Sequence, residues 1–174
     1  MLRRACDTAA MQDLIDRLDT AGAEMEALRP SVVAGEPWPL SEAYGAEPES
    51  SWGPKEVLAH VEEMLGYWPT QVDAILASPA SDPAPGFGRV ATDESRIRRV
   101  GEDRKLPADE LFDQVAAGSR DVAARMAALT PNQQARSGVH IRLGEMTIPA
   151  LYERFLVSHL EEHVRQLREV TERS

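Results

Sequence analysis

Four long stretches with apolar residues at helical spacing constrain the fold of this chain more than any other feature. They cover residues 8–28, 54–77, 107–129 and 147–170, and in each one apolar side chains recur every three or four positions. Proline and glycine are concentrated in two long connections, residues 30–53 and 78–106. No segment shows the alternation of a strand, the nearest being Val139–Gly144. We therefore predict an all-α fold, a four-helix bundle with long crossover loops, in one domain spanning residues 1–174.

Local signals predict where these helices begin and how they are interrupted. Gly53 is suited to cap the second helix, with Pro54 at its first helical position, and Thr147 is suited to cap the last one. Pro69 lies inside the second helix and predicts a kink or break there. A further short helix is expected after Thr92.

Composition excludes several classes of function. The chain has 19 basic and 29 acidic residues, a net charge of −10, which argues against non-specific binding to nucleic acid or to an anionic membrane. A single cysteine rules out an internal disulfide and a four-cysteine zinc site. No apolar run is long enough for a membrane span, and the first residues do not form a secretory signal. We expect a soluble cytoplasmic protein.

Two histidines in the last predicted helix suggest a metal site. His159 and His163 are four residues apart, and on a regular helical wheel both fall inside the apolar stripe. Two imidazoles at this spacing can bind one metal ion, although each can also be a hydrogen-bonded core residue. His60 lies at the flank of its stripe on the second helix and is the candidate third ligand. Glu162 either orients a ligand from behind or is a solvated flank charge.

Several short motifs, in matching order and spacing, resemble those of the DinB-like superfamily. They are Ser51–His60 at the start of the second helix, Gly138–His140, Gly144–Ile148, and His159–Leu167 in the last helix. This superfamily includes bacillithiol and mycothiol S-transferases and mycothiol-dependent maleylpyruvate isomerases, and it is built on a four-helix bundle with a three-histidine metal site.

The resemblance implies a ligand set, a metal and a reaction. His60, His159 and His163 are the implied ligands, with zinc or nickel as the metal. The implied reaction transfers a low-molecular-weight thiol, mycothiol or bacillithiol, to a small electrophile. A homodimer is compatible with the resemblance. His140 corresponds to a histidine often seen before the last helix of such proteins, and it is not assigned as a ligand.

Three imidazoles leave a coordination position open, which is typical of a catalytic metal site. An open divalent cation can bind a thiol as thiolate, or it can lower the pKa of bound water and support hydrolysis. The resemblance favours the thiol S-transferase. The alternatives are a metal-dependent hydrolase and a non-catalytic stress protein that binds metal or a small ligand.

Candidate substrate-binding residues come from a basic cluster and from aromatic side chains. The cluster comprises Arg89, Arg96, Arg98, Arg99, Arg104 and Lys105. Within it, Arg98 and Arg99 are the candidates for binding an anionic group, the alternative being a solvated helix face paired with nearby acids. Tyr67 and Tyr152 are candidates for lining a pocket beside the metal, the alternative being ordinary core positions.

Overall fold

The computed structural model describes residues 2–42, 51–80 and 83–173, with side chains from Ala9 onward. Its helices are α1 (Leu2–Ala27), α2 (Arg29–Ala34), α3 (Pro54–Ala77), α4 (Glu94–Asp103), α5 (Ala108–Ala128), α6 (Pro131–Gln134), α7 (Ile148–Tyr152), the π-helical turn η2 (Glu153–Val157) and α8 (Ser158–Glu172). Its strands are β1 (Gly86–Phe87), β2 (Ser137–His140) and β3 (Gly144–Thr147). The described part of the chain is thus mostly helical, as predicted.

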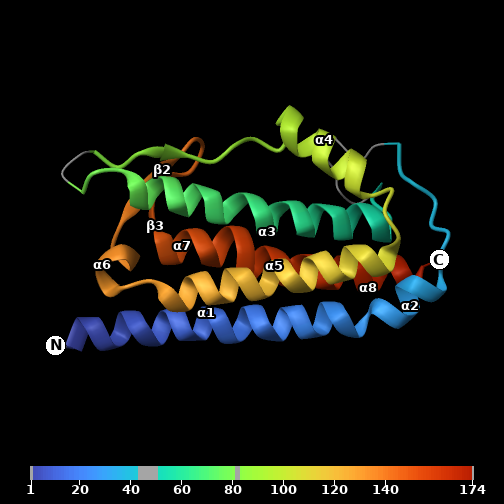
Figure 1. Cartoon of the computed structure of the whole chain (residues 1–174), viewed down its shortest axis with the longest axis horizontal. Helices are drawn as coiled ribbons and strands as arrows, with labels where there is room; N and C mark the ends of the chain where they lie inside the picture. The colour runs from blue at the N-terminus through green and yellow to red at the C-terminus, as the bar shows by residue number, and fades with distance from the viewer. Residues whose placement is uncertain (1, 43–50, 81–82, 174) are drawn as a thin grey trace.

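The long helices lie side by side, and each one packs against two others (Figure 1). Helix α1 packs against α5 and α8, and α3 packs against the same two helices from the other side. The core between them is apolar and includes Leu18, Met25, Leu58, Leu111, Met126 and Leu160, all at most 1% exposed. None of the helices in the described ranges has both the length and the apolarity that a membrane crossing requires.

The connection between α3 and α5 is long because these two neighbouring helices run in the same direction (Figure 1). After α3 ends, the chain must return along the full length of that helix before α5 can begin. Helix α4, the short helix expected after Thr92, forms on this return path and packs against α3. The side chain of Asp93 caps it by accepting hydrogen bonds from the backbone N–H groups of Ser95 and Arg96. The connection therefore covers the side of α3, and its length is set by the topology.

Helix α3 has the predicted bounds, and of the kink or break predicted at Pro69 the break does not occur. Gly53 is extended at the N-cap, Pro54 follows it, and the Glu56 side chain accepts a hydrogen bond from the Gly53 N–H at 3.1 Å. The helix continues through Pro69 without a break. Pro69 is buried, and the adjacent Trp68 ring is stacked on Phe155 of η2, 4.0 Å between centroids. This packing holds the helical path although one backbone donor is missing.

A small sheet forms where no strand was predicted, at the end of the molecule farthest from α2 (Figure 1). Strands β2 and β3 form an antiparallel hairpin, and β1 adds in parallel to β2, with Phe87 opposite His140. Strands of two and four residues are too short to show alternation, and β1 and β2 are separated in the sequence by the three helices α4, α5 and α6. The sequence pattern therefore could not reveal this pairing.

Candidate metal centre

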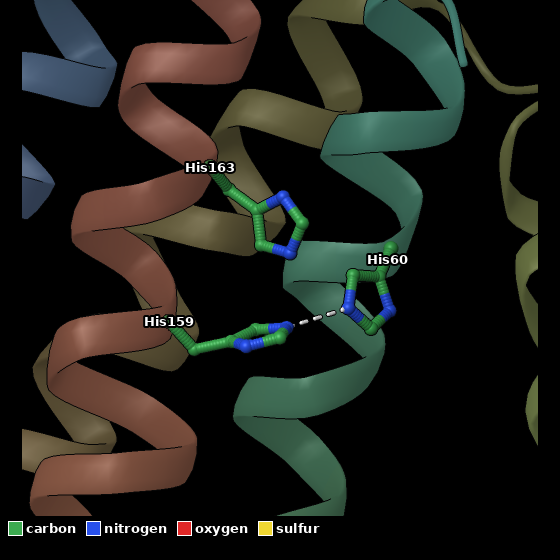
Figure 2. A group of neighbouring side chains, drawn as sticks. All are labelled: His60, His159 and His163. Carbon is green, nitrogen blue, oxygen red and sulfur yellow. Dashed lines mark hydrogen bonds between the residues drawn. The ribbon is translucent and has the colours of Figure 1, made fainter. Parts of the chain in front are cut away.

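Helices α3 and α8 bring the three predicted histidines together inside the protein. His60 comes from α3, while His159 and His163 come from consecutive turns of α8, and the three rings face one another (Figure 2). One ring nitrogen from each can be chosen so that all three lie within 4.8 Å of one another. These residues, separated by up to 99 positions, therefore form a group that could hold a metal ion.

The distances within this group suit a metal after small adjustments. The Nε2 atoms of His60 and His159 are 3.0 Å apart. The ring centroid of His163 lies 4.8 Å from that of His60 and 4.5 Å from that of His159. Two imidazole nitrogens bound tetrahedrally to one zinc ion lie about 3.3 Å apart, because each Zn–N bond is about 2.0–2.1 Å. Modest side-chain rotation would therefore place the three nitrogens around a common cation, and imidazole nitrogens suit several transition metals.

A π-helical turn decides which way the histidine pair faces. The backbone N–H of Ser158 donates to the carbonyl of Glu153, five residues earlier, where an α-helix would use the fourth. One extra residue in a helix turns everything beyond it by about 100° relative to a regular wheel. The wheel placed both histidines in one stripe with Tyr152. In the structure His163 is buried, whereas the side chain of His159 is 32% exposed and reaches the surface.

Burial favours the neutral form of two of these imidazoles, His60 and His159. It lowers the pKa of His60 well below its ordinary value, and His163 and Arg96 nearby lower it further. Burial, followed by the proximity of His163, lowers the pKa of His159 to about 3. Neutral imidazole is the form that binds a metal, so the protein supplies it well below neutral pH.

Each of the three histidines has a carboxylate or carboxamide three residues later on the same helix. Gln166 Oε1 lies 2.7 Å from His163 Nδ1, and Glu63 Oε2 lies 3.9 Å from His60 Nδ1. Glu162 Oε2 lies 4.0 Å from His159 Nδ1, and its side chain is 62% exposed. Of these three partners, the sequence motifs above predict only Glu162. The repeated spacing, His-x-x-Glu twice and His-x-x-Gln once, was the signal that could have identified Glu63 and Gln166.

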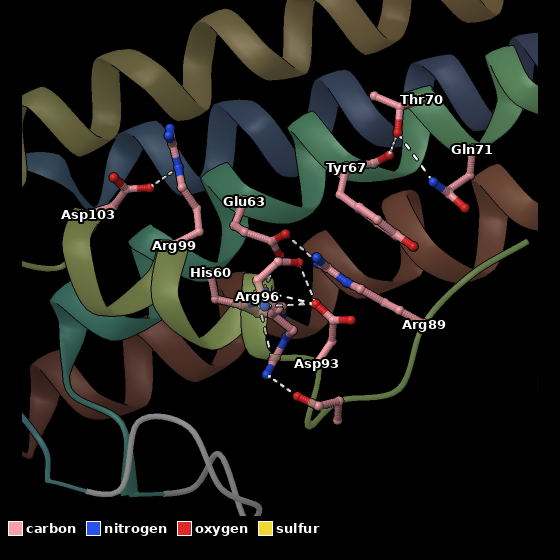
Figure 3. Close-up of polar contacts among 12 residues, drawn as sticks. His60, Glu63, Tyr67, Thr70, Gln71, Arg89, Asp93, Arg96, Arg99 and Asp103 are labelled. Atoms are coloured by element: carbon pink, nitrogen blue, oxygen red, sulfur yellow. Dashed lines mark hydrogen bonds and ion pairs between the residues drawn. The ribbon is translucent and has the colours of Figure 1, made fainter.

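Four arginines of the basic cluster lie in two different environments. Arg89 and Arg96 lie beside His60, the first paired with Glu63 and the second with its Nη2 3.4 Å from His60 Nδ1 (Figure 3). Arg98 and Arg99 are exposed on α4 and do not join the histidines. Arg99 pairs with Glu62 and Asp103. This pairing is the arrangement of a solvated helix face.

The two predicted tyrosines occupy different environments. Tyr67 is half-buried beneath the guanidinium of Arg89, 3.7 Å from the ring centroid, and burial raises the pKa of its hydroxyl. Tyr152 is 1% exposed in the core, where burial raises its pKa to about 12. The aromatic ring that packs on the histidine group is instead Trp52, 5.3 Å from His60.

A surface hollow of about 660 Å³ leads to the exposed edge of the histidine group. His159, Glu162, Phe155 and Arg154 contribute to its lining. His140 does not belong to the histidine group; it lies in β2, stacked on Phe155 with 5.0 Å between centroids. Of the three histidines, His159 is therefore the one that a small molecule in the hollow would contact.

Comparison with known proteins gives no relative from which a role can be transferred, since no family model, curated protein or solved structure matches this chain.

Proposed function

We propose that this protein is a metal-dependent thiol S-transferase of the DinB-like type, a four-helix bundle whose metal, zinc or nickel, is held by His60, His159 and His163. The observation that carries the proposal is the convergence of three imidazoles from two helices, with one ring nitrogen of each within 4.8 Å of the others. The motif resemblance then favours the reaction class over the other chemistry that such a site supports.

A bound divalent cation would supply Lewis acidity, which favours the thiolate form of a low-molecular-weight thiol at neutral pH. The protein's own residues would exclude water from one side of the site and attract an anionic group. Burial of His60 and His163 excludes water from one side of the site, and the partly exposed His159 leaves the other side open to the hollow. The positive charges of Arg89 and Arg96 favour an anionic group on the thiol or on its acceptor.

The first experiment measures metal and then thiol transfer. Elemental analysis of the purified protein is expected to find one zinc or nickel ion per chain. With that metal, mycothiol or bacillithiol is expected to react with monochlorobimane, forming a carbon–sulfur bond and releasing chloride and a proton, faster than in the absence of protein.

The outcomes separate the candidate functions. Ester or amide hydrolysis without added thiol would support the metal-dependent hydrolase. Tight metal binding without either activity, across a panel of electrophiles, would support the non-catalytic metal-binding protein. A protein that takes up neither zinc nor nickel would overturn the proposal entirely.

A further inference from the structure

The contacts around His60 favour one tautomer of its ring. The Nη2 atom of Arg96 is 3.4 Å from His60 Nδ1, and a guanidinium can only donate. His60 Nδ1 is therefore an acceptor. In the neutral form of His60, the single ring proton is then on Nε2, the nitrogen that faces His159.

The other two histidines carry their protons on the opposite nitrogen. With this tautomer of His60, its Nε2 donates to His159 Nε2, which lies 3.0 Å away, and neutral His159 then carries its own proton on Nδ1. His163 Nδ1 lies 2.7 Å from Gln166 Oε1 and donates to it. With these tautomers, the Nε2 atoms of His159 and His163 are unprotonated, whereas the Nε2 atom of His60 carries a proton. Figure 2 shows how the three rings face one another.

One carboxylate oxygen of Glu63 lies where it could accept a hydrogen bond from a protonated Nδ1 of His60, which would favour the other tautomer of that ring. Its side chain is 5% exposed, and Arg89 pairs with one of its two oxygens. The other oxygen, Oε2, is buried and makes no hydrogen bond within the described residues, yet it lies 3.9 Å from His60 Nδ1 (Figure 3). A buried hydrogen-bond acceptor without a donor lowers the stability of the fold, so its presence here needs a reason.

We propose that Glu63 is the positioning residue of the metal centre, accepting the Nδ1 proton of His60 in place of the contact with Arg96 when His60 Nε2 binds the metal. The proton leaves Nε2 and a proton arrives on Nδ1 through solvent, so His60 stays neutral and no net proton is released from it. Arg89 holds Glu63 in place, and is itself stacked on Tyr67 at 3.7 Å. This inference rests on the proposed metal site.

The test compares zinc affinity among matched carboxamide variants of the full chain, by titration against a competing chelator. In Glu63→Gln, the oxygen paired with Arg89 can stay, but the other position becomes an amide donor that cannot accept from Nδ1. We expect zinc to bind about 10- to 100-fold more weakly to this variant. Glu62→Gln removes the same charge one residue away, from a side chain paired with Arg99, and should leave the zinc affinity within about twofold.

A third variant ranks the two Glu partners. Glu162→Gln removes the exposed acid beside His159, where solvent can replace it, and should weaken zinc binding by less than about threefold. Equal affinity of Glu63→Gln and wild type would overturn the role of Glu63 while leaving the metal site intact. Equal losses in Glu62→Gln and Glu63→Gln would also overturn it, because the effect would then be one of charge alone.

Nitrogen-15 NMR of the imidazoles gives a readout that a purely structural role would not change. In the wild type, the proton of His60 is expected on Nε2 without metal and on Nδ1 with zinc. A zinc-loaded His60 without a proton on Nδ1 would overturn the proposal, and this measurement decides the matter if Glu63→Gln does not fold. A wild type that binds no zinc would instead refute the proposed function, so the two failures are distinguishable.

Discussion

At the scale of single residues, each of the three histidines that we propose as metal ligands lies in a distinct environment. His163 is buried and fixed by Gln166, His60 is buried among charged side chains, and His159 is open to the surface hollow. A ligand that is both buried and oriented loses little freedom on binding a metal. His163 is therefore expected to be the least replaceable of the three.

His163→Ala is predicted to reduce bound metal from one ion per chain to less than about a tenth of that, because two ligands hold a divalent ion far more weakly than three. Elemental analysis after dialysis measures the change, and circular dichroism checks that the helices remain. The matched control is His140→Ala, which removes a buried histidine outside the group and should keep its metal. Full metal content in His163→Ala would contradict the ligand assignment.

The lowered pKa values of His60 and His159 predict how the stability of the metal-free protein depends on pH. In the folded protein both pKa values lie below the value of about 6.5 in the unfolded chain, and that of His159 is about 3. At pH values between the folded and the unfolded pKa, the unfolded chain therefore binds more protons than the folded protein. Stability contributed by these groups is complete above about pH 6.5 and is lost as the pH falls below it.

Urea unfolding of the metal-free protein at pH 7.5 and pH 5.5 is expected to show a lower midpoint at the acidic pH. His159→Asn should reduce this difference because the variant lacks one of the titrating groups. An identical difference in the variant and the wild type would show that His159 does not contribute.

At the scale of secondary structure, the π-helical turn η2 joins two helical segments that bury different faces. Ile148, Leu151 and Tyr152 of α7 are fully or almost fully buried before the turn, and His163 is buried after it. The extra residue allows both faces to be buried at once, since a regular helix would rotate one of them out of the core.

Deletion of the exposed Arg154 is predicted to convert η2 to regular α-helix and to lower the free energy of unfolding by about 1.5 kcal/mol or more, because at least one large apolar side chain would leave the core. Arg154→Ala keeps the residue count and should change stability by less than about 0.5 kcal/mol. Thermal and urea unfolding measure both. Equal stability of the deletion and the substitution would show that the extra residue does not set the register.

At the scale of the whole molecule, contacts between distant segments fix the return path of the chain along α3. Gly88 follows β1 with φ +89° and lies against the ring of His140 from β2, while its N–H donates to Gln71 of α3. This small junction ties the crossover connection to the sheet and to α3, and it precedes the segment that delivers Arg89 and Arg96 to the histidine site.

Gly88→Ala is predicted to destabilise the fold by about 2 kcal/mol or more, since a Cβ there would combine an unfavourable backbone conformation with a collision. The added atom would lie 2.7 Å from His140 Nε2. Gly86→Ala is the control, because a Cβ at that position meets nothing within 4 Å and its φ is not positive. Similar unfolding midpoints for the two variants would contradict this account of the junction.

The sequence alone determined the helical class, the bounds of α3 and the candidate ligands, because helical periodicity, caps and the spacing of His159 and His163 are local properties. Only the tertiary structure decided which way the histidines face and which acid lies beside Nδ1 of His60. It also decided that Arg96 contacts His60 whereas Arg98 is exposed to solvent. Those features depend on one extra residue in η2 and on contacts across the helices, and no local pattern encodes the relative rotation of two packed helices.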